Sequence, residues 1–394
     1  MGRDGLSRRT LLSLGAAWAV SSAAGVAPSV GDVADVARAR RRELRREARR
    51  SQRRRRKAPP VPRVNGAINI QPIRRFGPEQ EPKNVDIIPR IIDLQMRELY
   101  ELGFDSIRLT LSFAELGFNL LGAIPYVRAA RALGIDVCGI VGQFGFFHDL
   151  ANVLADPERR RRVLDGYLTL YASPVAPAAR QIERTGEVSL QILNEPTNFL
   201  GVPPVDYVRR FLLPSYEHLK STAPGVTVLS AAPVGEKIGV RRVYDMLGAG
   251  LEDACDVVGL HVYDREVIPE LVGLTTKPVW ITETGAVGPE NHLGWVREVY
   301  PEMRRELPNV ERIFFFELFD LTPNAFRILD LAEREDGSIT TEVESTALYD
   351  DLAANVERAV DDAPRARYED LIPDITTYLP TPEDAELVFE LLET

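Results

Sequence analysis

Apolar runs of six to nine residues alternate with longer amphipathic stretches from residue 64 onward. Eight of these runs are rich in Val, Ile, Leu or Phe and are short enough to be β-strands rather than helices. The predicted strands lie at 64–70, 106–113, 136–144, 189–194, 226–234, 256–264, 278–284 and 312–319. Residues 189–198, "SLQILNEPTN", stand out because an apolar run there ends abruptly in an amide, a carboxylate and a proline.

The stretches between the runs predict helices. Residues 88–104 carry apolar side chains at nearly helical spacing, namely Ile91, Ile92, Leu94, Leu99 and Leu102. In the next helix, at 123–135, Gly134 stands where a left-handed C-terminal stop belongs. Further helices are expected at 156–185, 205–222, 240–250, 265–274, 289–306 and 343–359.

Strands that alternate with helices in this way indicate an α/β protein with a parallel sheet. Eight such repeats over about 300 residues fit a single (β/α)8 TIM barrel better than an open, doubly wound sheet. No Gly-x-Gly-x-x-Gly follows the first strand, which argues against a dinucleotide-binding fold. The barrel is expected at 64–359. An acidic C-terminal extension at 360–394 would be either an extra helix or a surface wrap.

The first 28 residues have the layout of a secretory signal. Arg3, Arg8 and Arg9 precede a short, mostly apolar stretch and then small residues. The run "SRRTLL" at 7–12 is similar to a twin-arginine signal, which directs folded proteins out of the cytoplasm. A membrane anchor is disfavoured because the apolar stretch is too short to span a bilayer. The mature protein is therefore expected to be secreted or held in the cell envelope.

Charge is divided unevenly along the chain. Residues 1–57 carry 16 Lys and Arg against 5 Asp and Glu, so the remaining 337 residues have a net charge of −21. An acidic body argues against nucleic acid as a partner. The Arg/Pro-rich linker at 29–63 includes the basic run 38–57, for which two interpretations stay open. It is either a solvated linker or an electrostatic contact with an anionic wall or membrane surface.

Several other chemistries lack their motifs. The two cysteines, Cys138 and Cys255, lie far apart in apolar runs and are expected to be buried free thiols. Four histidines with no His-x-His and no His-Glu-x-x-His predict no metal site, and no cofactor is expected. Without a Gly-x-Ser-x-Gly motif, a serine nucleophile is unsupported.

Two carboxylates at strand ends are the strongest candidates for chemistry. In a barrel of this kind the active site lies at the carboxyl ends of the strands. Glu195 ends the fourth strand and Glu283 the seventh, so both should converge on one mouth. Paired carboxylates in a cleft are what glycoside hydrolysis uses, one as nucleophile and one as proton donor.

Polar residues at other strand ends suit the same reaction. Arg108 on the second strand would keep Glu283 ionised, and Tyr263 would donate a hydrogen bond to the same carboxylate. Asn194 would bind a sugar hydroxyl beside the reacting carbon. His261 lies two residues before Tyr263 and so on the same face of its strand. Because strict alternation cannot point both Asn194 and Glu195 inward, a bulge or twist is expected there.

The motifs "ILNEP" at the fourth strand end and "WITETG" at the seventh resemble the retaining glycoside hydrolases of clan A, such as family 5 or family 39 barrels. The arginine of "SIRL", the "HVY" of strand six and the ending at 326–352 match the same pattern. The resemblance implies that Glu195 is the acid/base and Glu283 the nucleophile. It implies a supporting, substrate-binding shell of Arg108, Asn194, His261 and Tyr263. On the eighth strand, Glu317 is a further candidate, which would either bind sugar or pair with a basic side chain within the barrel.

The chain departs from that pattern at two strand ends. Many clan members end strand eight with a tryptophan, where this chain has Phe316, Glu317 and Phe319, and strand three ends in "GQFGFF". We expect an exported, monomeric hydrolase of β-linked oligo- or polysaccharide. Because of these departures its sugar is left open, and it would be either endo-acting on glucan or mannan or exo-acting like a xylosidase. The alternative is a non-catalytic carbohydrate-binding or wall-associated barrel, which has no need of two convergent acids.

Overall fold

The computed structural model describes most of the chain from residue 67 on. The described residues are 67–70, 88–111, 118–141, 156–165 without 159 and 163, 188–199, 201–318, 328–333, 339–359, and 366–386 without 385. The chain divides into two units, Met1–Pro59 and Pro60–Thr394, and all of these residues belong to the second. The predicted signal peptide at 1–28, the linker at 29–63 and the segment "GQFGFF" at 142–147 lie outside the described residues.

All eight predicted strands are present and form one parallel sheet. They are β1 (Ala67–Ile70), β2 (Ser106–Leu111), β3 (Asp136–Val141), β4 (Val188–Ile192), β5 (Thr227–Ser230), β6 (Val258–Val262), β7 (Val279–Thr284) and β8 (Val310–Phe315). Their order is β5-β4-β3-β2-β1-β8-β7-β6, with every neighbouring pair parallel. At the two ends of this order, one isolated parallel bridge joins Leu229 to Val257.

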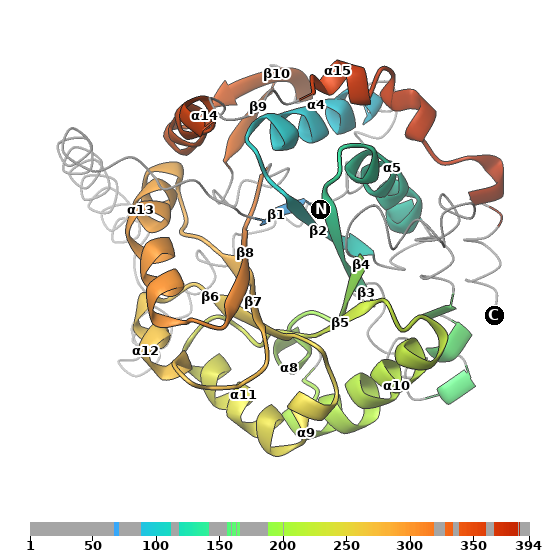
Figure 1. The fold of residues 1–394 in the computed structure, drawn as a ribbon, viewed down its shortest axis with the longest axis vertical. Coiled ribbons are helices and arrows are strands. Elements are labelled where there is room, and N and C mark those ends of the chain that lie inside the picture. The colour runs from blue at the N-terminus through green and yellow to red at the C-terminus, as the bar shows by residue number, and fades with distance from the viewer. Residues whose placement is uncertain are drawn as a thin grey trace, which may run out of the picture. The chain divides into compact units, whose positions relative to one another are not determined.

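Helices lie around the outside of the strands (Figure 1). The longer ones are α4 (Ile88–Glu101), α5 (Phe118–Ala132), α10 (Leu213–Thr222), α11 (Lys237–Gly248), α13 (Pro289–Glu306) and α14 (Ala347–Ala359). The shorter helical segments are α8 (Pro196–Phe199), α9 (Pro204–Asp206), the π-helix η3 (Tyr207–Leu212), η4 (Leu251–Asp253), η5 (Arg265–Val267), α12 (Ile268–Leu271), α15 (Tyr368–Leu371) and η7 (Ile375–Tyr378).

The apolar pattern that predicted the helices also decides how they pack. In α4, Ile91 and Leu99 are fully buried, because residues spaced seven or eight apart share one face of a helix. Gly134 has a φ of 70°, the left-handed conformation predicted for the end of α5. The predicted helix at 289–306 has the observed bounds of α13.

The segment after β8 differs from the prediction at its start. The helix predicted at 343–359 begins only at Ala347, because residues up to Ser345 belong to a strand. That strand, β10 (Ile339–Ser345), pairs antiparallel with β9 (Leu329–Glu333) in a separate two-stranded sheet. Thr and Val alternate with charged residues in 339–345, a period of two that suits a strand better than a helix.

Two sets of apolar side chains pack on the sheet. The larger one fills the space between the strands and the helices. A separate cluster contains Cys138, Leu229, Val257, Trp280 and Phe314. Because these residues come from strands spread across the whole order of the sheet, the sheet must curve to bring them together. Both cysteines are buried and free, as predicted, and burial raises the pKa of the Cys255 thiol to about 12.

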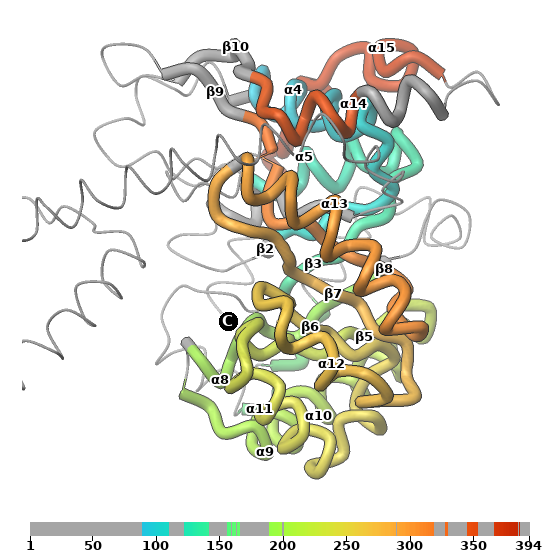
Figure 2. The backbone as a smooth tube through the Cα atoms, turned by 90° about the vertical axis from the view of Figure 1, so that its left-hand side faces the viewer, coloured from blue at the N-terminus to red at the C-terminus, as the bar shows by residue number. Residues whose placement is uncertain are grey.

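The C-terminal segment wraps the outside of α4 and α5. Figures 1 and 2 both show α15 beside α4, although they are far apart in the sequence. The Arg97 guanidinium stacks on the Tyr368 ring at 4.4 Å, and the Tyr100 hydroxyl donates to the Ala366 carbonyl at 2.8 Å. Arg128 of α5 forms an ion pair with Asp384 at 2.8 Å. The described part of this extension, residues 366–386 without 385, thus packs on α4 and α5 and contains the short helices α15 and η7.

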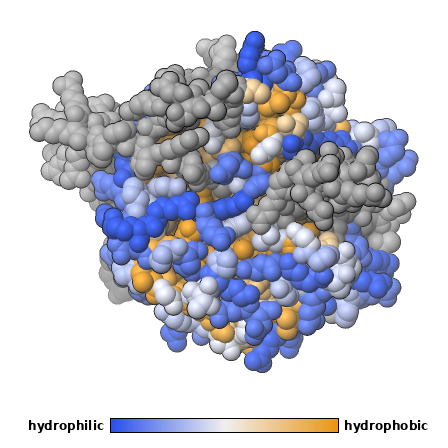
Figure 3. Space-filling model, in the orientation of Figure 1, coloured by the Kyte–Doolittle hydropathy of each residue, from blue (hydrophilic) through white to orange (hydrophobic). Residues whose placement is uncertain are grey.

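The outer surface is mixed in character. Hydrophilic side chains cover most of the described surface in the view of Figure 3, and hydrophobic ones show in the gaps between them. Among the described residues, no helix combines the length and apolarity needed to cross a membrane.

Candidate active site

Six of the seven predicted site residues lie in, or just beyond, the strands β2, β4, β6 and β7, and their side chains meet in one place. Arg108 lies in β2, Asn194 and Glu195 follow β4, His261 lies in β6 with Tyr263 just beyond it, and Glu283 lies near the end of β7. The residues with exposed fractions under 9% are Arg108, Asn194, Glu195, His261 and Glu283. Hydrogen bonds and ion pairs join all six into one network.

The end of β4 has the twist that the sequence requires. Leu193 and Glu195 both have positive φ values, 64° and 42°. Such angles are rare outside glycine because the Cβ atom crowds the backbone, and they are found where surrounding structure holds the chain in place. They break the strict alternation of a strand. As a result Asn194 and Glu195, adjacent in sequence, both reach the network.

Arg108 donates hydrogen bonds to three other side chains of the network, and its own side chain is only 1% exposed. Its guanidinium donates to the Gln191 Oε1 atom at 2.9 Å, to Asn194 Oδ1 at 2.8 Å and to Glu283 Oε1 at 2.9 Å. A planar guanidinium with five donors in a fixed fork suits three acceptors on separate side chains. Arg108 therefore fixes the position of Glu283 relative to the end of β4.

Glu283 is held in its charged form. Burial alone raises the pKa of this carboxyl, but the charges of His261 and Arg108 and the hydrogen bonds from Arg108 and Tyr263 outweigh it. The net effect puts the pKa of Glu283 below its ordinary value. Tyr263 donates to Glu283 Oε2 at 2.8 Å, the contact that the sequence predicts. Burial first, then the Glu283 charge, raise the pKa of the Tyr263 hydroxyl well above its usual value, so it remains a donor.

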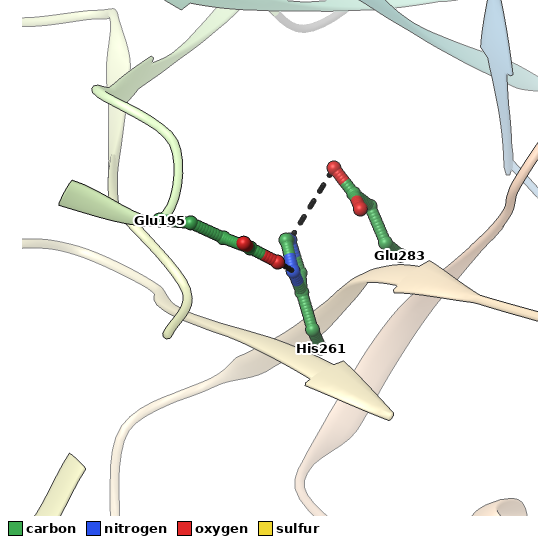
Figure 4. Close-up of side chains that lie close together, drawn as sticks. All are labelled: Glu195, His261 and Glu283. Carbon is green, nitrogen blue, oxygen red and sulfur yellow. Dashed lines mark hydrogen bonds and ion pairs between the residues drawn. The ribbon is translucent and has the colours of Figure 1, made fainter. Parts of the chain in front are cut away.

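Glu195 has a different set of partners. Its Oε1 atom lies 2.9 Å from His261 Nδ1, and its Oε2 atom accepts from Asn198 Nδ2 at 3.4 Å. The other ring nitrogen of His261 lies 3.5 Å from Glu283 Oε1, so the imidazole stands between the two carboxylates (Figure 4). One carboxylate is thus paired with arginine and tyrosine, and the other with histidine and asparagine.

The three central side chains also have a spacing that a metal ion could use. Glu195, His261 and Glu283 each offer a ligand atom, and these atoms lie within 4.8 Å of one another. The Arg108 guanidinium already supplies a positive charge at the Glu283 oxygen. A divalent cation held by these three residues would lie close to the fixed guanidinium, and two positive charges at short range repel each other.

Asn194 is positioned by the same network. Its Oδ1 atom accepts from Arg108 and, at 3.1 Å, from Gln191 Nε2, while its Nδ2 lies 3.4 Å from Glu283 Oε1. With the oxygen occupied, the amide nitrogen is the atom that faces the Glu283 carboxylate. This orientation fits the predicted contact with a sugar hydroxyl beside that carboxylate.

Glu317 and its neighbour reach the same edge of the sheet. Glu317 follows β8 and is 2% exposed. The Phe316 ring lies edge-on to Tyr263 with centroids 6.5 Å apart, and the Phe316–Glu317 peptide bond is cis. An aromatic side chain therefore stands at the end of β8, where the sequence has phenylalanine in place of tryptophan.

Two members of the network, Gln191 and Asn198, were not predicted from the sequence. Gln191 is fully buried and links Arg108 to Asn194 through both ends of its amide. Its signal was available, since a glutamine inside the apolar run "SLQIL" must find partners when the strand is buried. Asn198 had no such signal, because asparagine is common in the loop that follows a strand.

Comparison with known proteins places the fold. No protein-family model matches the chain, and no curated protein does. Among solved structures, the catalytic domain of the GH30 xylanase C from Talaromyces cellulolyticus aligns over 75% of this chain and 75% of its own, with a TM-score of 0.50 and 13% identity. The GH39 enzyme from Xanthomonas axonopodis pv. citri aligns over 75% of this chain and 67% of its own, with a TM-score of 0.50 and 12% identity.

These likenesses concern the fold. The chain resembles clan A glycoside hydrolases in the arrangement of its strands and helices, as its strand-end motifs predict. At 12–13% identity the comparisons assign no activity to it.

Proposed function

We propose that the protein is a retaining glycoside hydrolase that cleaves β-linked oligo- or polysaccharide. Glu283 would be the nucleophile and Glu195 the acid/base. The observation that carries this proposal is the pair of buried carboxylates with unlike surroundings, of which only Glu283 is held ionised by a guanidinium and a phenol. Two carboxyl groups whose environments differ in this way can divide the roles of nucleophile and proton donor.

In the first step Glu283 would attack the anomeric carbon of the sugar. The bond from that carbon to the glycosidic oxygen breaks, and Glu195 gives its proton to the departing oxygen. The product is a sugar esterified to Glu283. Asn194, with its amide nitrogen 3.4 Å from Glu283 Oε1, would donate to the neighbouring sugar hydroxyl as charge develops.

In the second step Glu195, now a carboxylate, would remove a proton from water. The resulting oxygen attacks the anomeric carbon, the ester bond to Glu283 breaks, and Glu195 regains its proton. His261, 2.9 Å from Glu195, would hold the carboxyl group in place through both steps. Two inversions at one carbon retain its configuration.

The spacing of the carboxylates supports retention over inversion. Oxygen atoms of Glu195 and Glu283 lie within 4.8 Å of each other. Retaining enzymes hold their carboxyl groups about 5–5.5 Å apart, whereas inverting enzymes need about 6.5–9.5 Å to admit a water molecule. The proposal also includes a sheet that closes as a barrel between β5 and β6, supported by the bridge from Leu229 to Val257.

A substrate panel tests the reaction. Purified residues 58–394 would be incubated with aryl β-glycosides and with β-glucans, mannans and xylans, beside Glu283→Ala and Glu195→Ala. We expect release of sugar by the wild type and its loss in Glu283→Ala. Undiminished hydrolysis by Glu283→Ala would reject the assigned nucleophile. Binding of a polysaccharide without any hydrolysis would favour a non-catalytic carbohydrate-binding barrel.

We also propose export by the twin-arginine route, on the strength of the sequence at 1–28. The full chain and an Arg8→Lys, Arg9→Lys variant would be expressed in a host with that route, and cell fractions probed with an antibody. The proposal expects envelope or medium for the first and cytoplasm for the second. The same fraction for both would reject twin-arginine export.

A further inference from the structure

One buried tyrosine stands between two strands beside the candidate site. Tyr207 opens the π-helix η3 and is fully buried. Its hydroxyl donates to the Ile192 carbonyl of β4 at 2.8 Å and accepts from the Ala231 N–H, just beyond β5, at 2.6 Å. Burial raises the pKa of this hydroxyl, so it keeps the proton that it donates.

The two groups that it joins would otherwise bond each other. β4 and β5 pair in parallel with Ile192 opposite Ser230. In such a ladder a carbonyl accepts from the N–H one residue beyond its partner, which for Ile192 is that of Ala231. The Tyr207 hydroxyl takes the place of this ladder bond, since it is hydrogen-bonded to both groups.

The ladder resumes out of phase immediately after this insertion. Leu193 donates its N–H toward β3, to the Val141 carbonyl at 3.0 Å, so alternation would send the N–H of Asn194 toward β5. Instead it is the Glu195 N–H that bonds on the β5 side, to the Ala232 carbonyl at 3.2 Å. The change of phase falls between Leu193 and Glu195, the two residues with positive φ.

We propose that Tyr207 is a positioning residue whose hydroxyl, inserted between β4 and β5, makes β4 end with Asn194 and Glu195 on the same side. The proposal rests on the assignment of Glu195 as acid/base. Without the inserted hydroxyl, Ile192 and Ala231 would bond directly and alternation would continue one residue further. Glu195 would then turn away from His261 and from the bond to be cleaved.

Tyr207→Phe tests this, because it removes one oxygen and keeps the ring. If the proton donor is displaced, hydrolysis slows for substrates whose leaving group must be protonated. Hydrolysis of substrates with a leaving group that needs no proton keeps its rate. We expect kcat/KM to fall by about 10- to 100-fold for an alkyl or sugar leaving group. For a dinitrophenyl leaving group it should change by less than about threefold. Tyr126→Phe is the matched control, since Tyr126 of α5 is equally buried and its hydroxyl donates a hydrogen bond to Gln95 of α4.

Two comparisons separate the inference from the proposed function. Glu195→Ala should show the same dependence on the leaving group, and more strongly; if it does not, the acid/base assignment fails. Suppose that Glu195→Ala shows this dependence on the leaving group. If Tyr207→Phe then loses activity equally on both substrates, or keeps full activity on both, the positioning role is wrong. An equal loss on both is what a reduced folded fraction would produce.

A crystal structure of Tyr207→Phe gives a readout that needs no activity. The inference expects a direct Ile192–Ala231 hydrogen bond of about 2.9–3.0 Å and a Leu193 residue that has left the positive-φ region. Unchanged backbone angles at Leu193 and Glu195 would overturn it, whether or not the wild type hydrolyses any sugar of the panel.

Discussion

Replacing Arg108 by methionine tests the electrostatic account of the site. Methionine keeps most of the length of the side chain and removes the charge and three hydrogen bonds, to Gln191, Asn194 and Glu283. The pair with Glu283 is buried, with exposed fractions of 1% and 10% for the two side chains. Removing one partner of such a pair costs about 3–5 kcal/mol of folding free energy, because a charge is left buried and unpaired.

The sign of the pH dependence follows from the shift at Glu283. In the wild type its pKa is held below the ordinary value, so its charged form stabilises the fold above that value, and this contribution is lost as the pH falls through the folded pKa. In Arg108→Met the burial remains without the guanidinium, and the pKa of Glu283 should rise. The deficit in stability should then be largest near pH 7 and shrink toward pH 4, as the carboxylate takes a proton.

Urea denaturation at several pH values, followed by tryptophan fluorescence, measures this. A second substitution, Glu283→Gln, should restore part of the lost stability in the Arg108→Met background and should not do so in the wild type. Arg312→Met is the control, since Arg312 pairs with Asp136 at 2.6 Å at the opposite ends of the strands. A pH-independent deficit, or no coupling between Arg108 and Glu283, would refute the reasoning.

Three further changes probe other parts of the network and the wrap. Tyr263→Phe removes a hydrogen bond to charged Glu283, so the pKa of Glu283 should rise. The acidic limb of the pH profile of kcat/KM should then move to higher pH, and an unmoved limb would contradict the assignment of Glu283. Asn198→Ala should lower kcat by up to about tenfold with KM unchanged, since Asn198 donates to Glu195; an effect on KM alone would count against this role. Arg128→Ala should lower the free energy of unfolding by about 1–3 kcal/mol, because it breaks the pair with buried Asp384. It should leave kcat unaltered. An unchanged free energy of unfolding would mean that the contact of the C-terminal segment with α5 adds little to the stability of the fold.

The sequence predicted the elements well because each of them was specified locally. The eight strands were recognisable from apolar runs that a parallel sheet buries on both faces. The helix α13 carried its own signals, with Pro289 at its first position and two arginines in its last turn. The strand β10 was not predicted, because the helix expected at 343–359 included its last residues. These residues alternate between apolar or small and charged side chains, and the helical spacing begins only with α14.

The structure brings six of the predicted site residues together, whereas Gln191, Asn198 and Tyr207, which contact them or their strand, were not predicted. That Glu195 and Glu283 lie near each other follows from parallel topology, since the carboxyl ends of parallel strands meet at one edge, whereas Arg108 reaches Glu283 from within β2. The contact of Gln191 with Arg108 depends on which way a buried amide turns. The insertion of Tyr207 between two strands joins residues that are distant in sequence, and no local pattern encodes it.

The most direct test of the central claim is to trap the sugar on the protein. The substrate that the panel identifies would be prepared as its 2-deoxy-2-fluoro dinitrophenyl glycoside, which forms the ester rapidly and releases it slowly. The account predicts that intact-mass spectrometry shows one added glycosyl group, that peptide mapping places it on Glu283, and that Glu283→Ala remains unmodified. A label on any other residue, or a hydrolysis product of inverted configuration, would contradict a two-step reaction through Glu283.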